Sequence, residues 1–371
     1  MSKNIRVGIT HGDFNGVGYE VMLKALADEQ IPELFTPVLF ADMRLIDRAV
    51  KEFALELPKI QTVRSAADAK EGQINVVDLR LPDIKVKPGE PDKVSGAAAV
   101  SALEEAVKAI KEGTIDVMVT APISKEAVQA EGFHFPGHTE YLADRAGEEY
   151  KPLMVLFDDD LRVALVTTHL PLAKVPEAVT RERVADMIRR FEKVLRQDFG
   201  IERPKVAVLS LNPHCGDGGV LGSEEKDEII PAIEETSKEG ILSFGPFSSD
   251  AFFASDRGYR DFDGVLAMYH DQGLAPFKTI ARTGGVNFTA ALPFVRTSPD
   301  HGTACDIAWK GEADPASMRE AIYRAIDIFR TRQRHLQASR NPLRKAQRPE
   351  KGDKKKEADK SVDLSKETIT E

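Results

Sequence analysis

Cysteine is scarce in this 371-residue chain, which contains only Cys215 and Cys305. Two cysteines cannot supply the disulfide framework of a small secreted domain, so we expect a protein of the reducing cytoplasm. No apolar run approaches the roughly eighteen residues of a membrane-spanning helix, and we expect no membrane partner. The first residues enter a strand-like run directly, without the apolar segment of a signal peptide.

An excess of basic residues is also lacking. Lysine and arginine number 51 against 60 aspartates and glutamates, which gives a formal net charge of −9. This balance argues against a general nucleic-acid-binding protein. The hydrophobic share of 42% and the charged share of 30% are ordinary for a globular chain, and the length suffices for two domains with sizeable cores.

Strand-like apolar runs alternate with helical patterns along the chain. The clearest helix is predicted from Ser95 to Gly113, because Val100, Leu103, Val107 and Ile110 form one apolar stripe. A second long helix is predicted from Thr180 to Phe199. Alternation of this kind predicts an α/β protein with a mostly parallel sheet. The strand-like runs lie at 5–9, 36–40, 74–77, 115–120, 153–157, 161–168, 205–211 and 264–269.

Three histidines follow strand-like runs. His169 and His270 come directly after such runs, and His214 follows one after Asn212 and Pro213. We expect each to lie where a strand ends and a loop begins, and ligands of open α/β sheets bind at such strand ends. Three imidazoles with an open position are typical of a catalytic metal site. Three unrelated loop histidines would give the same pattern, because no close-spaced metal motif is present.

Polar residues near His270 and further along the chain could complete a site. Asp271 could orient the neighbouring imidazole, and Lys278 supplies a point charge for an anion. Asn287 and Arg296 could extend an anchor for phosphate or carboxylate, with the guanidinium binding through two hydrogen bonds. Ordinary surface polarity is the alternative interpretation of these residues.

Two further segments leave alternatives open. The turn from Thr10 to Glu20 is rich in glycine and could hold an anion on its backbone N–H groups, or it could be only a tight strand-to-helix turn. His138 could bind substrate or be an ordinary loop histidine, while Thr139 is placed to cap a helix that runs to about Ala146.

The C-terminal end differs in composition from the rest. Of the last 31 residues, nine are basic and seven are acidic, and none is aromatic. Such a segment cannot bury enough apolar surface to fold, so residues 339–371 are predicted to be a disordered charged tail.

Several long motifs occur together and in a fixed order between about residues 5 and 335. They are FPGHTEYL (135–142), VALVTTHLPL (163–172), LNPHCGDGG (211–219), VLAMYHDQGLAPFK (265–278) and GGVNFTAALPFVRTSPDHGTA (284–304). In these motifs the chain resembles the 4-hydroxythreonine-4-phosphate dehydrogenase family of vitamin B6 biosynthesis. It departs from the family pattern in the opening turn, at His11, Asp13, Phe14 and Asn15.

The resemblance implies a two-domain α/β/α fold like that of isocitrate and isopropylmalate dehydrogenases. Residues 1–143 plus 303–338 would form the domain with the NAD contacts, and residues 144–302 the domain with the metal ligands and dimer contacts. The protein would be a homodimer whose active sites lie in the interdomain clefts at the subunit interface. His169 and His214 would come from one chain and His270 from the other.

The resemblance also implies the reaction, which is an NAD- or NADP-dependent and divalent-metal-dependent oxidation of 4-phosphooxy-L-threonine. The 3-keto acid formed would decarboxylate to 3-amino-2-oxopropyl phosphate. Zinc suits the imidazole ligands, with cobalt, magnesium, manganese and nickel as alternatives. The alternatives are a related dehydrogenase of D-threonate or D-erythronate 4-phosphate in sugar-acid catabolism, and a non-catalytic metal- or phosphate-binding protein on the same fold.

Each site residue has a role under this resemblance. The metal ligands would be His169, His214 and His270, and these would also be catalytic together with Asp271 and Lys278. The substrate would be bound by His138, Thr139, Lys278, Asn287 and Arg296. Asp250 and Asp271 would support the site, and His301, Gly302 and Thr303 would contact the nicotinamide cofactor.

Overall fold

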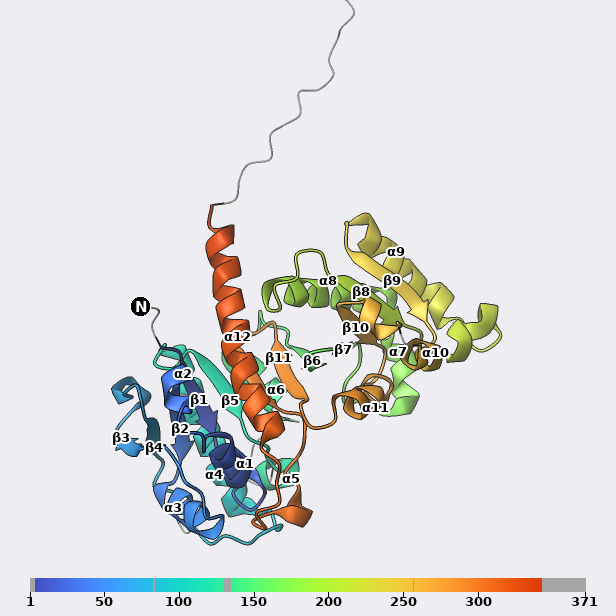
Figure 1. The fold of residues 1–371 in the computed structure, drawn as a ribbon. Helices are drawn as coiled ribbons and strands as arrows, with labels where there is room; N and C mark the ends of the chain where they lie inside the picture. The colour runs from blue at the N-terminus through green and yellow to red at the C-terminus, as the bar shows by residue number, and fades with distance from the viewer. Residues whose placement is uncertain (1–3, 83, 130–134, 136, 256, 342–371) are drawn as a thin grey trace, which may run out of the picture.

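The computed structural model describes residues 4–82, 84–129, 135, 137–255 and 257–341. All but three residues of the expected 339–371 tail therefore lie outside the described part. Two lobes stand side by side, one formed by the N-terminal strands and helices and the other by the segments from about residue 160 to 280 (Figure 1). The last helix, α12 (Ala316–Ser339), runs along the first lobe and extends past it.

Strands and helices alternate through most of the described chain. The remaining helices of five residues or more are α1 (Gly18–Ala25), α3 (Met43–Glu52), α4 (Lys93–Lys111), α5 (Lys125–Gln129), α6 (His138–Ala146), α8 (Arg181–Gln197), α9 (Ile230–Lys238), α10 (Ser249–Ala254) and α11 (His270–Ala281), with short turns α2 (Ile31–Leu34) and α7 (Val175–Ala178). The strands are β1 (Arg6–Thr10), β2 (Thr36–Ala41), β3 (Ile60–Val63), β4 (Ile74–Asp78), β5 (Val117–Thr120), β6 (Leu153–Phe157), β7 (Arg162–Leu165), β8 (Lys205–Leu209), β9 (Leu242–Phe247), β10 (Gly264–Ala267), β11 (Val286–Ala290) and β12 (Val295–Pro299).

Within the described residues, one 12-stranded sheet crosses both lobes in the order β3-β4-β2-β1-β5-β12-β11-β6-β7-β10-β8-β9. Pairing is parallel except at β12–β11, β11–β6 and β6–β7. The prediction of a mostly parallel α/β sheet is therefore confirmed. The three antiparallel pairs lie where the lobes join, and the predicted domain boundaries fall within α6 and in the segment after β12.

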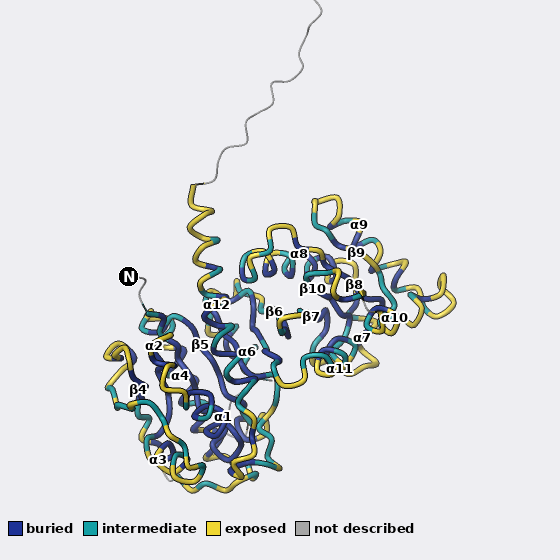
Figure 2. Tube along the Cα trace, viewed as in Figure 1, coloured by how far each residue is buried: buried dark blue, intermediate teal, exposed yellow. Residues whose placement is uncertain are grey.

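The first lobe is built on buried parallel strands covered by helices. All six residues of β2 and all four of β5 are buried, which explains their unbroken apolar sequences. Helix α4 begins where the Asp92 carboxylate accepts a hydrogen bond from the backbone N–H of Ser95 at 2.9 Å. The strands form the buried interior, while the far end of α12 is exposed (Figure 2).

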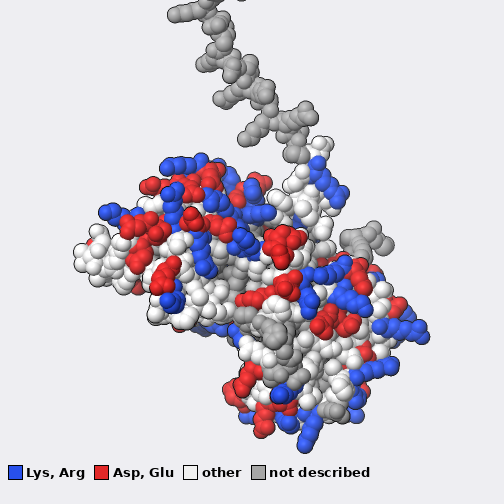
Figure 3. Space-filling model, turned by 180° about the vertical axis from the view of Figure 1, so that it is seen from behind, with Lys and Arg blue, Asp and Glu red and all other residues white. Residues whose placement is uncertain are grey.

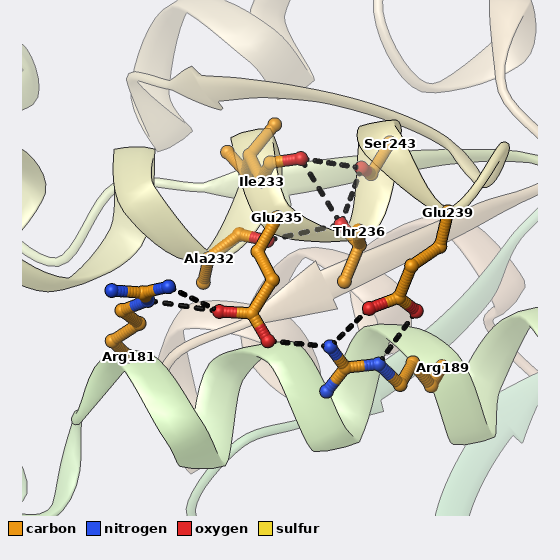
Figure 4. A network of polar contacts seen from close by, with 8 residues as sticks. All are labelled: Arg181, Arg189, Ala232, Ile233, Glu235, Thr236, Glu239 and Ser243. Carbon is orange, nitrogen blue, oxygen red and sulfur yellow. Dashed lines mark hydrogen bonds and ion pairs between the residues drawn. The ribbon is translucent and has the colours of Figure 1, made fainter.

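In the second lobe, α8 lies against α9. Thr180 caps α8 through the backbone N–H of Arg183, so the predicted helix start is confirmed. Charged side chains join the two helices: Arg189 contacts Glu235 and Glu239, and Arg181 contacts Glu235 at 2.7 Å (Figure 4). These groups are substantially exposed and water screens their charges, so each pair contributes little to stability.

The segment after β10 differs from the prediction. His270 was expected at the start of a loop, but it is the first residue of helix α11. Gly273 and Pro276 reduce the intrinsic helix propensity of this segment, so its sequence did not indicate a helix. Packing outweighs propensity here, because Gly273, Leu274 and Phe277 are buried against the sheet.

No helix of the described part is both long and apolar enough to cross a membrane. On the face seen from behind, basic and acidic side chains are interspersed over both lobes (Figure 3).

Candidate functional site

A cavity of about 280 Å³, lined by both apolar and polar side chains, lies where the two lobes meet. Its walls come from the carboxyl end of β5, the start of α6, strands β6, β11 and β12, and the start of α11. The volume is near the lower end of the range for small-molecule sites. The cavity brings together nine of the residues predicted from the sequence: His138, Thr139, His169, His270, Lys278, Asn287, Arg296, His301 and Gly302.

Arg296 is the most deeply buried charged group in this cavity, with 2% exposure. Its guanidinium donates to the hydroxyl oxygens of Thr120 and Thr289, the latter at 2.8 Å. Among the described residues, no carboxylate lies within ion-pair distance of it. Burial lowers the pKa of Arg296 to about 9, so the group remains charged at neutral pH. The charge of Glu140 raises this pKa to a smaller extent without pairing with the guanidinium. A buried cation without a paired carboxylate is disfavoured, and an anionic ligand would supply the missing charge.

His138 and Asn287 add hydrogen-bonding groups to the same wall. Burial, together with the charges of Arg296 and Lys125, holds the pKa of His138 well below its usual range, so its imidazole is neutral at pH 7. The side-chain oxygen of Asn287 is buried and has no hydrogen-bond partner among the described residues. Thr139 approaches Thr289 at 3.5 Å through the hydroxyl oxygens. These groups can orient a bound molecule without adding charge.

His169 and His270 lie together at the ends of neighbouring strands. Their ring centroids are 6.1 Å apart. The Nδ1 atom of His270 lies 2.8 Å from Asp271 Oδ1, as expected for an orienting carboxylate, and the Nδ1 atom of His169 lies 3.9 Å from Glu140 Oε1. The contact with Asp271 places the His270 proton on Nδ1 and makes its Nε2 lone pair available for a metal ion, whereas the distance from His169 to Glu140 is longer than a hydrogen bond.

Hydrogen bonds fix the strand ends that carry these histidines. The Gln272 side chain accepts from the backbone N–H of Met268 and donates to the carbonyl of Ser210 and the hydroxyl of Ser249. The Thr167 hydroxyl donates to the Met268 carbonyl at 2.7 Å. Through these bonds, the ends of β7, β10 and β8 form one connected unit.

His214 lies outside the cavity wall of its own chain, although it follows β8, the neighbour of β10. Its side chain is exposed, and its charge is among the causes that lower the pKa of Asp250, after that carboxylate's hydrogen bonds with Ser248 and Ala251. Asp250 and Asp271 are likewise absent from the cavity wall. In the described residues, no three histidine, cysteine or acidic side chains of one chain are placed to hold a metal ion. The pair in ring contact is His169 with His270, whereas the resemblance implied His169 with His214.

The glycine-rich opening turn packs against the expected cofactor loop. The backbone N–H of Val17 donates to the carbonyl of Thr303 at 3.1 Å, and the Trp309 indole donates to the carbonyl of Phe14 at 2.7 Å. Gly12 has a φ of +68° and lies so close to Pro122 that a Cβ would be 2.3 Å from its carbonyl oxygen. Residues 10–22 are all buried, which favours the interpretation as a packed strand-to-helix turn over that of an open anion site.

Lys125 and Glu140 line the cavity but were not predicted from the sequence. Lys125 follows β5, and Glu140 lies in the first turn of α6. The sequence signal was present for Lys125, because a charged residue follows a buried strand. Glu140 could not be paired with His169 before the fold was known, since the two are 29 positions apart in the sequence.

The fold and site define an α/β protein with an interlobe cleft for a small anionic ligand and two adjacent imidazoles. Residues 33–325 match the family model described as pyridoxal phosphate biosynthetic protein PdxA. The chain is 51% identical over 347 residues to a 4-hydroxythreonine-4-phosphate dehydrogenase of Bacteroides thetaiotaomicron, covering 93% of this chain and 94% of the relative. The chain belongs to this family.

Two further comparisons bear on the fold and the substrate. A crystal structure of 4-hydroxythreonine-4-phosphate dehydrogenase from Klebsiella pneumoniae is 33% identical, with a TM-score of 0.76 over 88% of this chain and 98% of that one. A protein of Oceanobacillus iheyensis, provisionally named a D-threonate 4-phosphate dehydrogenase, is 41% identical over 90% of this chain and all of the relative.

Proposed function

We propose that this chain is an NAD-dependent dehydrogenase of 4-phosphooxy-L-threonine that acts in pyridoxal 5'-phosphate biosynthesis. The observation that supports this proposal most directly is the position of Arg296. Its buried guanidinium faces the interlobe cavity and is not paired with a carboxylate among the described residues. The substrate carries a phosphate and a carboxylate, either of which provides the missing negative charge. The family membership and the 51% identical relative support the choice of substrate.

The residues of the cavity hold and orient this substrate. Arg296, Lys278 and Lys125 supply positive charge for its two anionic groups. Lys278 is itself positioned by the Asp300 carbonyl, which its ammonium contacts at 2.8 Å. The neutral His138 and the free acceptor of Asn287 bind its uncharged or donor groups. Fixing both ends of the molecule places the central alcohol carbon for reaction.

In the reaction, the alcohol carbon loses a hydride to NAD⁺ and its hydroxyl loses a proton, which gives the 3-keto acid. Loss of CO₂ then yields 3-amino-2-oxopropyl phosphate. Residues His301 to Thr303 would contact the nicotinamide cofactor, and His301 has a buried Nε2 without a hydrogen-bond partner among the described residues.

His169 and His270 fit a divalent metal, because their ring centroids lie 6.1 Å apart and Asp271 holds the His270 ring with Nε2 available. When bound, such an ion is a Lewis acid that lowers the pKa of the substrate alcohol. Imidazole ligands favour zinc, with cobalt, nickel, manganese and magnesium as alternatives. Asp271 would orient His270, and Asp250 would support His214.

The third imidazole is proposed to come from a second copy of the chain. One chain brings His169 and His270 together and leaves His214 outside the cavity. Exposed apolar side chains flank these histidines, and such residues are typical of a buried interface: Leu170, Leu172, Val220 and Leu221. The site would then hold His169 and His270 of one chain with His214 of the partner subunit in a homodimer.

Two broader proposals concern the division into domains and the cellular compartment. Residues 1–143 plus 303–338 would form the cofactor domain, and residues 144–302 the domain with the metal ligands. Both cysteines are free in the structure, which fits a reducing compartment such as the cytoplasm.

D-Threonate 4-phosphate is a second candidate substrate, because the 41% identical Oceanobacillus iheyensis relative is named for it. The test follows NADH formation by absorbance with each substrate, with and without prior treatment with a metal chelator. We expect chelator-sensitive turnover of 4-phosphooxy-L-threonine at the higher kcat/KM. A higher kcat/KM with D-threonate 4-phosphate would mean that this compound is the substrate. Turnover that persists after complete metal removal would refute the metal site.

A further inference from the structure

The segment that carries His214 has a strained backbone. His214, Cys215, Gly216, Asp217 and Gly218 all have positive φ angles, of 52°, 53°, 77°, 44° and 66°. Three of these residues are not glycine, and an L-residue is sterically disfavoured in this conformation. Five consecutive left-handed residues form a turn that the surrounding structure must hold in place, and such strain is concentrated at functional sites.

A buried carboxylate holds the entry to this turn. Glu225 is 2% exposed and begins the π-helical turn Glu225–Ile229. Its Oε1 atom accepts from the backbone N–H groups of Leu211 and Asn212, at 2.8 and 2.7 Å. Its Oε2 atom accepts from the Asn212 side-chain amide at 3.0 Å. The carboxylate therefore fixes the backbone two residues before His214, and π-helical turns often occur at functional sites.

The same carboxylate packs against the middle of the turn. A Cβ on Gly216 would lie 2.7 Å from Glu225 Oε2, so only glycine permits this close approach. The Gly216 carbonyl accepts from the backbone N–H of Leu221 at 3.0 Å, which closes the turn. The Cys215 thiol contacts the Pro246 carbonyl at 3.4 Å and anchors the opposite side on β9.

We infer that Glu225 is a positioning residue, which maintains the left-handed turn so that the His214 imidazole is held outward in the orientation needed to bind a metal ion. The inference rests on the proposed function, in which His214 is a metal ligand. Without the carboxylate, the Leu211 and Asn212 N–H groups lose their acceptor and the strained turn relaxes to ordinary φ angles. The ligand then has to be ordered again each time the metal binds.

The test uses the full-length metal-free protein and Co²⁺ alone as the probe, because its visible absorption reports the ligand set. In Glu225→Gln, one acceptor oxygen remains, but the charge is lost and an NH₂ donor replaces the oxygen that accepts from the Asn212 amide. We therefore expect Co²⁺ affinity to fall about 10- to 100-fold, which is typical of lost support behind a metal ligand. The absorption spectrum should also change. Glu224→Gln is the matched control: Glu224 accepts from the same Asn212 amide at 2.7 Å, whereas the backbone N–H groups of residues 211 and 212 donate to Glu225. This variant should keep the parental affinity and spectrum.

Two more variants separate the possible failures. His214→Ala should lose Co²⁺ affinity, and if it does not, the proposed ligand set is wrong independently of Glu225. If His214→Ala loses Co²⁺ and Glu225→Gln binds it as the parent does, the inference about Glu225 is overturned. If Glu225→Gln does not fold, Gly218→Ala provides the test. The added Cβ meets no atom within 4 Å, so this substitution strains only the backbone of the turn, at φ +66°. Parental Co²⁺ affinity in Gly218→Ala would then reject the inference, and reduced affinity would support it.

Discussion

Single side chains in the cavity determine which ligands it accepts. Arg296 is held by two threonine hydroxyls, so its planar guanidinium is fixed before any ligand binds. Lys278 and Lys125 lie in the same cavity but are exposed, and water screens their charges. The buried group should therefore contribute more binding energy per charge than either lysine.

Replacing Arg296 with lysine tests this difference. Arg296→Lys keeps the positive charge but loses the planar pair of donors, so we expect kcat/KM to fall about a hundredfold or more. The measurement is steady-state NADH formation. Arg334→Lys, an exposed position on α12, is the control and should match the parent. A parental kcat/KM in Arg296→Lys would mean that the guanidinium does not contact the substrate.

A second residue-scale prediction concerns acid stability. His11 has no exposed surface, and burial lowers its pKa to about 4 against smaller raising effects from Gly12, Asp42 and Ala98. Because this folded-state pKa lies below the unfolded value of about 6.5, the unfolded chain binds the proton first as the pH falls. Stability is therefore lost between about pH 6.5 and pH 4, by up to roughly 3 kcal/mol.

His11→Phe removes this proton-binding site and keeps a ring beside Tyr19, whose ring centroid lies 5.1 Å from that of His11. We expect the free energy of unfolding, from urea titrations at several pH values, to depend less steeply on pH in this variant. His335→Phe on α12 should keep the parental slope. An unchanged slope in His11→Phe would show that other groups cause the acid sensitivity.

At the scale of elements, α11 depends on one close contact with the sheet. A Cβ on Gly273 would lie 2.8 Å from Val163 Cγ1 and 2.9 Å from Leu165 Cδ2. Both atoms belong to β7, which precedes His169. The helix that begins with His270 and the strand that leads to His169 are thus set at a fixed separation.

Gly273→Ala should force these elements apart. We expect a loss of about 1–3 kcal/mol in the free energy of unfolding, because the added methyl overpacks a filled core. Chemical denaturation measures this loss. Gly284→Ala is the matched control, since its Cβ would meet only the Ala281 carbonyl oxygen, at 4.0 Å. Equal stability of the two variants would contradict the tight packing.

At the scale of the whole molecule, mixing inactive variants tests how the histidines are shared. If His169 and His270 belong to one chain and His214 to its partner, mixed dimers of His169→Ala and His214→Ala contain one intact site. About a quarter of parental activity should return after random exchange of subunits. Mixing His169→Ala with His270→Ala should restore none.

The distribution of the histidines between the two chains that the sequence motifs implied predicts the opposite outcome for these two mixtures. With His169 and His214 on one chain, the His169→Ala and His270→Ala mixture would regain activity, and the His169→Ala and His214→Ala mixture would not. His214→Ala mixed with His270→Ala should regain activity under both arrangements and is the positive control. Failure of all three mixtures, with exchange verified, would place the whole site within one chain.

Much of the local structure could be predicted from the sequence. The stripe of Val100, Leu103, Val107 and Ile110 predicted α4, and Thr180 marked the start of α8. Their signals are local, since periodicity and capping depend on neighbours within a few residues. Helix α11 was missed because Gly273 and Pro276 lower its propensity, while the contacts that stabilise it come from β7 and β10, about 100 and six positions away.

The site residues were found by their types and by motifs, but their arrangement was not. Residue types and their order are enough to show that histidines follow strands, that an amide and a guanidinium lie downstream, and that the family motifs occur in order. The folded chain is needed to show that β10 lies between β7 and β8, that Glu140 faces His169, and that Arg296 is buried. Strand order and burial depend on contacts between distant segments, and no local pattern in the chain specifies which segments meet.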